Sequence, residues 1–204
     1  MPLEIFLRFL AILSLAVLIG GCSQSSDSSA QDGSAPLRPV PYGSTSSRTD
    51  SILAGKVVRV IDGDTVDVLD SSMNVHRVRL KGIDAPERGQ AFYQVAKENL
   101  DAIAINREVT ISWNKVDKWN RIIGKVLLDR RDVCLEQIRA GLAWHFKKYQ
   151  NEQSEEDRQL YDSAEKEARS SRRGLWHDDS PTAPWKKRDR RLNEASMNLL
   201  KEMK

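Results

Sequence analysis

The chain has 204 residues, a formal net charge of +3 and 40% hydrophobic residues, which is typical of one folded domain with flanking segments. Its two cysteines exclude a disulfide framework, and its three histidines lack the spacing of zinc ligands. Residues 186–204 hold seven basic and three acidic side chains, so the remainder carries a net charge of about −1 and must attract any anionic ligand locally.

Residues 1–21 have the pattern of a secretory signal. Arg8 precedes an apolar run over residues 9–19, which is too short to span a membrane comfortably. The run leads into Gly20-Gly21-Cys22, which resembles a bacterial lipobox. Lipidation of Cys22 would anchor the chain, outside the cytoplasm, to the cell membrane or an outer membrane. An uncleaved anchor, or a plain signal peptide with a stray cysteine, is the alternative interpretation.

The next segment has the composition of a spacer. Residues 23–50 are rich in Ser, Gly, Pro and Asp and have almost no large apolar side chains. Such a segment cannot bury enough surface to fold. We therefore expect residues 22–52 to be a disordered, flexible tether between the anchor and a domain that begins at Leu53.

From Leu53 onward, apolar residues recur in short runs that turn residues interrupt. An Asp-Gly turn follows the first β-branched run, and Asp70-Ser71-Ser72 breaks the second. The pattern predicts five short strands, over residues 56–61, 65–69, 75–83, 109–113 and 122–128.

Two of three predicted helices follow within this region. The first begins near Gln90 or Ala91 and presents one apolar stripe. The stripe consists of Phe92, Val95, Ala96, Leu100 and Ile103. The second helix is short, with Asp132 as its N-cap and Gly141 as its C-terminal stop, and Cys134 at its start is expected to be a buried thiol.

The third predicted helix begins near Ser154, where Glu155-Glu156-Asp157 in the first turn suit the helix dipole. Gly174 is expected to end it, and Trp176 to pin it onto the strands. Its inward-facing residues are expected to be Leu160, Ala164 and Ala168.

These elements predict a mainly β fold with helices (α+β), a five-stranded OB-type Greek-key barrel with three helices, over residues 53–179. Residues 180–204 form a basic tail with an apolar stripe at helical spacing, made of Leu192, Ala195, Leu199 and Met203. The tail is either a solvated, partly helical extension or a basic arm that touches nucleic acid or anionic headgroups.

The residues with the clearest chemistry lie between Asp62 and Glu87. Asp64, Asp84 and Glu87 are hard oxygen ligands or proton acceptors, and Arg79 offers a planar fork that fits a phosphate. Neighbouring strands would bring all four to one place. Carboxylates, a metal and an arginine together indicate phosphoryl chemistry, whereas an Asp-Gly pair alone is more typical of an ordinary turn.

Several motifs follow one another in a characteristic order. They are Ile61-Asp62-Gly63-Asp64-Thr65-Val66, Val78-Arg79-Leu80, Ile83-Asp84-Ala85-Pro86-Glu87, Asp117-Lys118-Trp119-Asn120-Arg121, Ala140-Gly141-Leu142-Ala143 and Arg173-Gly174-Leu175-Trp176. Together they resemble the staphylococcal nuclease family over residues 53–179, and the resemblance implies the same barrel.

The resemblance also implies roles for the carboxylates. Asp64 and Asp84 would bind Ca²⁺ through their side chains, and the backbone carbonyl of Ala85 would complete the protein ligands. Asp62 is expected to add negative potential and orient the loop, or simply to stabilise the turn. Glu87 would act on the attacking water, either as a general base or by orienting it.

Arg79 and Arg121 occupy the two positions that the family uses to clamp a phosphate, where a guanidinium favours the charge of the pentacovalent state. The resemblance places further substrate contacts at Lys118, Trp119, Lys147 and Tyr149. Trp119 and Lys147 stand where the family founder has tyrosines, so the base preference is expected to differ.

By this resemblance, we expect a calcium-dependent endonuclease that hydrolyses DNA and RNA with low sequence selectivity, prefers single strands and leaves 3′-phosphates. It would act as a monomer without a protein partner. Two other interpretations stay open. One is a non-catalytic OB-fold module that binds nucleic acid or protein at the cell envelope. The other is an envelope protein in which the barrel is only a spacer.

Overall fold

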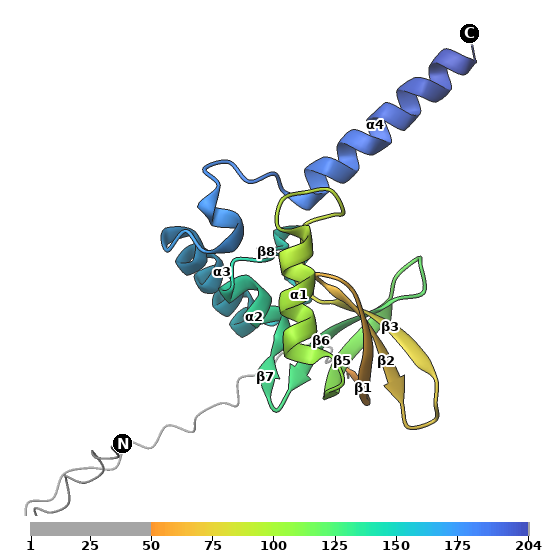
Figure 1. Ribbon diagram of the computed structural model, residues 1–204. Helices are drawn as coiled ribbons and strands as arrows, with labels where there is room; N and C mark the ends of the chain where they lie inside the picture. The colour runs from red at the N-terminus through yellow and green to blue at the C-terminus, as the bar shows by residue number, and fades with distance from the viewer. Residues whose placement is uncertain (1–49, 204) are drawn as a thin grey trace, which may run out of the picture. The chain divides into compact units, whose positions relative to one another are not determined.

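The computed structural model describes residues 50–203, which form a closed β-barrel with helices beside it (Figure 1). The barrel strands are β1 (Ser51–Asp62), β2 (Thr65–Asp70), β3 (Val75–Leu80), β5 (Glu108–Val116) and β6 (Ile122–Leu128). Neighbours pair antiparallel in the order β3-β2-β1-β5-β6, and a parallel pairing of β3 with β6 closes the sheet on itself. The predicted five-stranded OB-type barrel is confirmed.

Alternating side chains line the interior of the barrel. In β6, Ile122, Gly124, Val126 and Leu128 are buried, and the residues between them are more exposed. Gly124 is required because a Cβ at this position would come within 2.2 Å of the Ile111 side chain on β5. The missing side chain lets β5 and β6 pack closely where β6 also meets β3.

Three short strands add to the barrel. β7 (Arg131–Asp132) extends the sheet beside β6, and β4 (Ile83–Asp84) pairs with β8 (Trp144–His145). The chain turns at Lys81 and Gly82, so the single strand predicted for residues 75–83 is wrong. This turn places Asp84 on a separate two-residue strand.

The helices of the described region include the three that were predicted. They are α1 (Tyr93–Ala104), α2 (Val133–Arg139), α3 (Glu155–Ser170) and α4 (Pro184–Glu202), with the 3-10 helices η1 (Lys147–Glu152) and η2 (Gly174–His177). The Asp132 side chain caps α2 by accepting hydrogen bonds from the N–H groups of Cys134 and Leu135. Ser154 caps α3 by accepting one from the N–H of Asp157. The predicted cap at Asp132, the predicted start of the third helix near Ser154 and the burial of Cys134 are confirmed.

Two predicted helix ends are wrong, and positive φ angles explain both. α1 begins at Tyr93, two to three residues later than predicted, because Phe92 adopts a left-handed φ of 64°. α3 ends at Ser170 rather than at Gly174, and Arg172 beyond it has a φ of 50°. A residue in that conformation cannot continue a right-handed helix.

The predicted inward faces are partly wrong. The side chains of Val95 in α1 and Leu160 in α3 are 48% and 46% exposed. Tyr161 takes the buried position instead, because its ring fills the core and its hydroxyl donates a hydrogen bond to Asp132 Oδ2 at 2.7 Å. The other predicted inward positions in α3 are confirmed for Ala164 and Ala168.

Trp176 belongs to a second apolar cluster, with Trp144, Ala168, Leu175 and Ala183. Its ring meets Trp144 edge-to-face, with 5.4 Å between centroids. Because Ala168 lies on α3 and Trp144 on β8, this cluster fixes α3 next to the barrel, and the predicted packing role of Trp176 is confirmed.

The tail contains a full fourth helix, α4, which starts directly after this cluster with Pro184 at its first position. Of the predicted apolar stripe, Leu192, Leu199 and Met203 are more than half exposed. The expectation of a partly helical tail therefore understated its helical content.

Residues 1–49 lie outside the described part of the chain, so the signal segment, the lipidation of Cys22 and most of the tether stay predictions. β1 begins at Ser51, two residues before the predicted start of the domain. Among the helices between residues 50 and 203, none combines the length and the apolar character needed to cross a membrane.

The leucines that were both expected to face inward provide a matched test. Leu100 is fully buried and Leu160 is 46% exposed. We expect Leu100→Ala to lower the free energy of unfolding by about 2–5 kcal/mol, because it opens a cavity in the core. Leu160→Ala should lower it by less than about 1 kcal/mol. Urea unfolding followed by circular dichroism measures both, and equal losses would contradict the placement of α1 and α3.

Candidate active site

The turn between β1 and β2 is held from two sides. At its tip, a Cβ on Gly63 would come within 2.8 Å of the Cβ atoms of Ala85 and Ala96, so only glycine lets α1 approach this closely. The side-chain amide of Gln137 on α2 is fully buried and donates hydrogen bonds to the carbonyls of Gly63, at 2.6 Å, and Ala96, at 2.9 Å. The turn is therefore fixed against both α1 and α2.

Two buried carboxylates lie beside this turn, and their residues, Asp64 and Asp84, are only 6% and 1% exposed. Asp64 Oδ2 accepts a hydrogen bond from the backbone N–H of Ala85 at 2.6 Å, and its Oδ1 accepts one from the Thr65 hydroxyl at 3.1 Å. Asp62 Oδ1 accepts the backbone N–H of Asp64 at 3.1 Å, as an ordered turn requires. The bond from Ala85 ties the turn to the segment that carries Asp84.

Arg79 joins the two carboxylates. Its Nη2 atom lies 2.9 Å from Asp84 Oδ1 and 3.1 Å from Asp64 Oδ2, and its Nη1 donates a hydrogen bond to the carbonyl of Leu80 at 3.0 Å. At this residue β3 pairs with both β2 and β6, so closure of the barrel fixes the position of the guanidinium. The structure thus brings together three residues that the motifs singled out.

The buried charges shift the acidity of both carboxyl groups. Burial raises the pKa of Asp64 to about 7, although the guanidinium of Arg79 opposes the shift, and the nearby charge of Asp62 adds to it. Burial also raises the pKa of Asp84, against a hydrogen bond from Arg188 and the charge of Arg79. In both residues the largest cause is burial, because the interior solvates a charged carboxylate less well than water does.

All of the predicted catalytic residues line one open cavity of about 1530 Å³, together with the predicted metal ligands. Glu87 reaches it from the loop before α1, where its backbone N–H donates a hydrogen bond to Gln90 Oε1 at 2.8 Å. Arg121 reaches it from the loop before β6. The Arg121 guanidinium is held by Asp117 at 2.8 Å, and Asp117 Oδ1 also accepts the N–H groups of Trp119 and Arg121.

The predicted substrate contacts lie toward the rim. Trp119 is 66% exposed, with the ammonium of Lys118 4.5 Å and the guanidinium of Arg121 5.1 Å from its ring centroid. Tyr149 also lines the cavity and is 45% exposed. Lys147 lines it too, but its ammonium lies 2.6 Å from Asp162 Oδ1. The structure therefore exposes both aromatic side chains at the rim, with cationic side chains over their rings, and gives Lys147 a carboxylate partner.

Two residues of the site were missed from the sequence. Gln137 orders the turn, as described above. Arg188, on α4, places its Nη2 atom 2.6 Å from Asp84 Oδ2 and its Nη1 atom 2.7 Å from Glu87 Oε1. Arg188 belongs to a run of basic residues, and nothing in that run distinguishes it from its neighbours.

The donor set suits a hard divalent cation. Asp64 and Asp84 offer carboxylate oxygens, which calcium and magnesium prefer, and the carboxylates of Asp62 and Glu87 line the same cavity. Within residues 50–203, no group of three or more His, Cys, Asp or Glu side chains is arranged to hold a metal. Further ligands would therefore have to be backbone carbonyls, water or substrate oxygens.

A model of the family described as staphylococcal nuclease homologue matches residues 77–178 of the chain. The chain belongs to the staphylococcal nuclease family. The match covers Arg79, Asp84, Glu87 and Arg121, whereas Arg188 lies beyond it.

Three relatives align with about two thirds of this chain. A micrococcal nuclease of Shigella flexneri is 38% identical over 141 residues, which are 65% of this chain and 78% of the relative. An uncharacterized endonuclease of Escherichia coli is 36% identical over 132 residues, 64% of this chain and 82% of the relative. Protein ParB of Escherichia coli is 37% identical over 143 residues, 66% and 78% of the two chains. The family and the two relatives named as nucleases identify the protein as a hydrolase that acts on nucleic acids.

The raised pKa of Asp64 predicts a pH-dependent stability. Between its ordinary value of 3.8 and about 7, the folded nuclease keeps a proton on Asp64 that the unfolded chain loses, so stability falls as pH rises through this window. Asp64→Asn keeps the neutral form at every pH. In chelator, we expect its stability advantage over wild type to grow across the window and to reach about 1–3 kcal/mol near pH 8. Urea unfolding at several pH values measures it, and an advantage that is constant or shrinks with pH would contradict the shift.

Proposed function

We propose that this nuclease is a calcium-dependent phosphodiesterase that cleaves DNA and RNA endonucleolytically, with low sequence selectivity, and leaves 3′-phosphates. The observation that carries the proposal is the ion-paired group of Asp64, Arg79 and Asp84, which shares one cavity with Glu87 and Arg121. Buried negative charge beside guanidinium groups suits a cation and a phosphate together.

Asp64 and Asp84 would hold the calcium ion, with the backbone carbonyl of Ala85 as a further donor. When bound, the ion would supply positive charge next to the scissile phosphate. Asp62 would act through the backbone of the turn, since its carboxylate already accepts the N–H of Asp64. The ordered turn then keeps the Asp64 side chain in place without a rearrangement during the reaction.

In the proposed reaction a water oxygen attacks phosphorus, and the bond from phosphorus to the 5′ oxygen breaks. Glu87 lies on a loop that Pro86 stiffens and that Gln90 holds. Its carboxylate would accept a proton or a hydrogen bond from this water. The departing 5′ oxygen takes up a proton from solvent. Arg79 and Arg121 would bind the non-bridging oxygens, where charge grows in the transition state.

The rim residues favour an unpaired strand. Trp119 and Tyr149 are exposed, and a base would stack on either ring by displacing a cationic side chain that lies over it. Such stacking tolerates any base. Lys118 and Lys148 add positive charge close to those rings. Contacts of this kind recognise the backbone and the π-face of a base, so weak sequence selectivity is expected.

The proposed location of the enzyme rests on the sequence of its first 22 residues. The apolar run and the Gly20-Gly21-Cys22 pattern support a lipid anchor outside the cytoplasm, with the following polar segment as a spacer. We propose that the nuclease is anchored there as a monomer and acts on nucleic acid that reaches the envelope.

Arg79 and Arg77 provide a matched pair of arginines on β3. Arg77 binds Asp67 and does not line the cavity, whereas Arg79 holds both buried carboxylates. We expect Arg79→Ala to lower turnover of single-stranded DNA by about 10²–10³-fold, as for the loss of one preorganised donor. Arg77→Ala should keep turnover within about twofold of wild type.

The assay follows cleavage of a labelled oligonucleotide in Ca²⁺ and tests the product ends with a phosphatase specific for 3′-phosphates. Near-normal turnover by Arg79→Ala, or products with 5′-phosphates, would contradict the proposed reaction. Tight binding of DNA by wild type without cleavage in any divalent ion would favour a non-catalytic binding module instead.

A further inference from the structure

The first turns of α4 lie on the candidate active site. Arg188 forms ion pairs with Asp84 Oδ2 at 2.6 Å and Glu87 Oε1 at 2.7 Å, and its Nη1 atom also lies 3.2 Å from Asp84 Oδ1. Its side chain is 32% exposed, so this contact is half-buried. One guanidinium from the tail therefore binds a proposed calcium ligand and the residue proposed to act on water.

Other contacts seat α4 independently of Arg188. The ring of Trp185 stacks on Phe146, with centroids 5.4 Å apart and planes 18° apart, and meets Trp144 edge-to-face at 6.2 Å. Gln90 Nε2 donates a hydrogen bond to the carbonyl of Thr182 at 2.8 Å.

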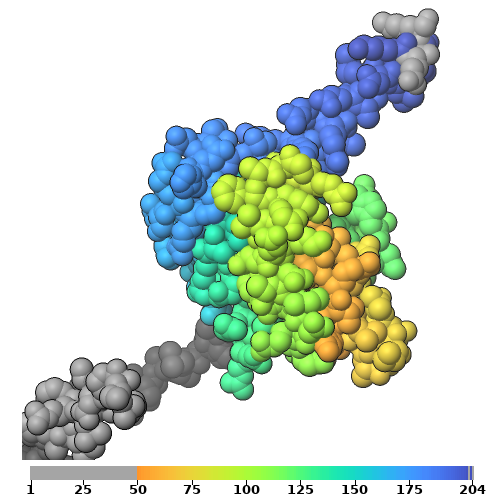
Figure 2. All heavy atoms as spheres, viewed as in Figure 1, coloured from red at the N-terminus to blue at the C-terminus, as the bar shows by residue number. Residues whose placement is uncertain are grey.

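On the neighbouring turn, the ammonium of Lys187 donates to the carbonyl of Arg88. In the space-filling view, the loop before α1 and the start of α4 touch (Figure 2). The start of α4 is thus fixed to both sides of the cavity.

The charges of this contact bear directly on cation binding. Arg79 and Arg188 together engage both oxygens of Asp84, and Arg188 also neutralises Glu87. A divalent cation on Asp84 would stand next to the guanidinium of Arg188 and repel it at short range. The ion and the seated arginine therefore compete for the same carboxylate.

We propose that the start of α4 is a built-in gate, in which Arg188 takes the place of the divalent cation at Asp84 and Glu87 until calcium displaces it. The proposal rests on the function proposed above for these carboxylates. It assigns a role to a segment that lies beyond the matched family residues 77–178. Calcium binding then requires α4 to leave the cavity, which also frees Glu87 and opens the site to substrate.

The test compares calcium affinity in full-length variants by isothermal titration calorimetry, without substrate. If only a small fraction of wild-type molecules has α4 away from the cavity, the apparent calcium affinity is reduced by that fraction. A variant in which α4 no longer seats should therefore bind calcium about tenfold more tightly, or more. We expect this gain in Arg188→Gln. Trp185→Ala, which breaks the stack on Phe146 without touching a carboxylate, should tighten binding in the same direction.

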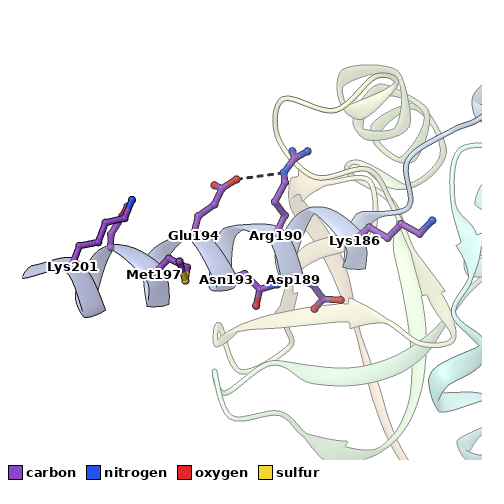
Figure 3. A pocket seen from close by; sticks show the side chains of 8 residues that line it. Lys186, Asp189, Arg190, Asn193, Glu194, Met197 and Lys201 are labelled. Carbon is purple, nitrogen blue, oxygen red and sulfur yellow. Dashed lines mark ion pairs between the residues drawn. The ribbon is translucent and has the colours of Figure 1, made fainter.

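Arg190→Gln is the control, because it removes the same charge from the same helix. Figure 3 shows Arg190 on α4 with its ion pair to Glu194, which is 3.8 Å long and lies along the helix surface. We expect this variant to bind calcium as wild type does. A second measurement is hydrogen exchange at residues 184–191, which should become faster when calcium is added to wild type.

Three outcomes separate the possibilities. Tighter calcium binding by Arg188→Gln and Trp185→Ala, but not by Arg190→Gln, supports the gate. Unchanged or weaker binding by Arg188→Gln, or slower exchange at α4 in calcium, overturns it while the proposed function stands. Absence of calcium binding by wild type and by Arg188→Gln overturns the calcium dependence itself and the gate with it.

Discussion

The ion pairs that Arg79 makes with Asp64 and Asp84 lie below the surface, where water solvates them poorly. Burial of a charge is costly unless partners compensate for it, and here one guanidinium serves two carboxylates. Much of the local structure maintains this arrangement. Gln137 fixes the turn before Asp64, the backbone of Ala85 binds its carboxylate, and the closure of β3 onto β6 fixes the guanidinium. The barrel therefore acts as a rigid frame for a group of charges that would separate in water.

The two buried carboxylates, which share one guanidinium, connect the fold with the chemistry. A nuclease must bring a phosphate, itself an anion, close to carboxylates that act on water, and only added positive charge makes that approach favourable. In the proposed reaction, Arg79 and Arg121 would supply part of that charge, and a calcium ion on Asp64 and Asp84 would supply the rest. In the seated form, Arg188 fills the same electrostatic need from within the chain. The resting and working forms of the site would then differ in which cation compensates Asp84.

The features that were predicted correctly from the sequence are those that depend on neighbouring residues. The cap at Asp132 and the five strands follow from short-range patterns. The motifs that contain the Asp-Gly turn and Arg79 lie close together in the sequence, and this indicates a shared site. Apolar periodicity gave the wrong inward residue in α3, where Tyr161 rather than its neighbour Leu160 is buried. The Tyr161 ring can be buried there because its hydroxyl has a hydrogen-bond partner in Asp132. The contact of Arg188 with Asp84 joins residues 104 positions apart. No periodicity or motif could have predicted it, because it depends on how the cluster around Trp176 directs the chain into α4.

The most direct test of this account measures whether cleavage of DNA requires calcium and whether it requires Glu87. Purified protein and its Glu87→Gln variant would be incubated with labelled single-stranded DNA, first in Ca²⁺ and then in excess chelator. The account predicts cleavage by wild type that stops in chelator, with turnover that falls at least about 10²-fold in the variant, on the scale of general acid–base catalysis. Cleavage that continues in chelator and is unaffected by Glu87→Gln would contradict it, because neither the buried carboxylates nor the residue beside them would then take part in the reaction.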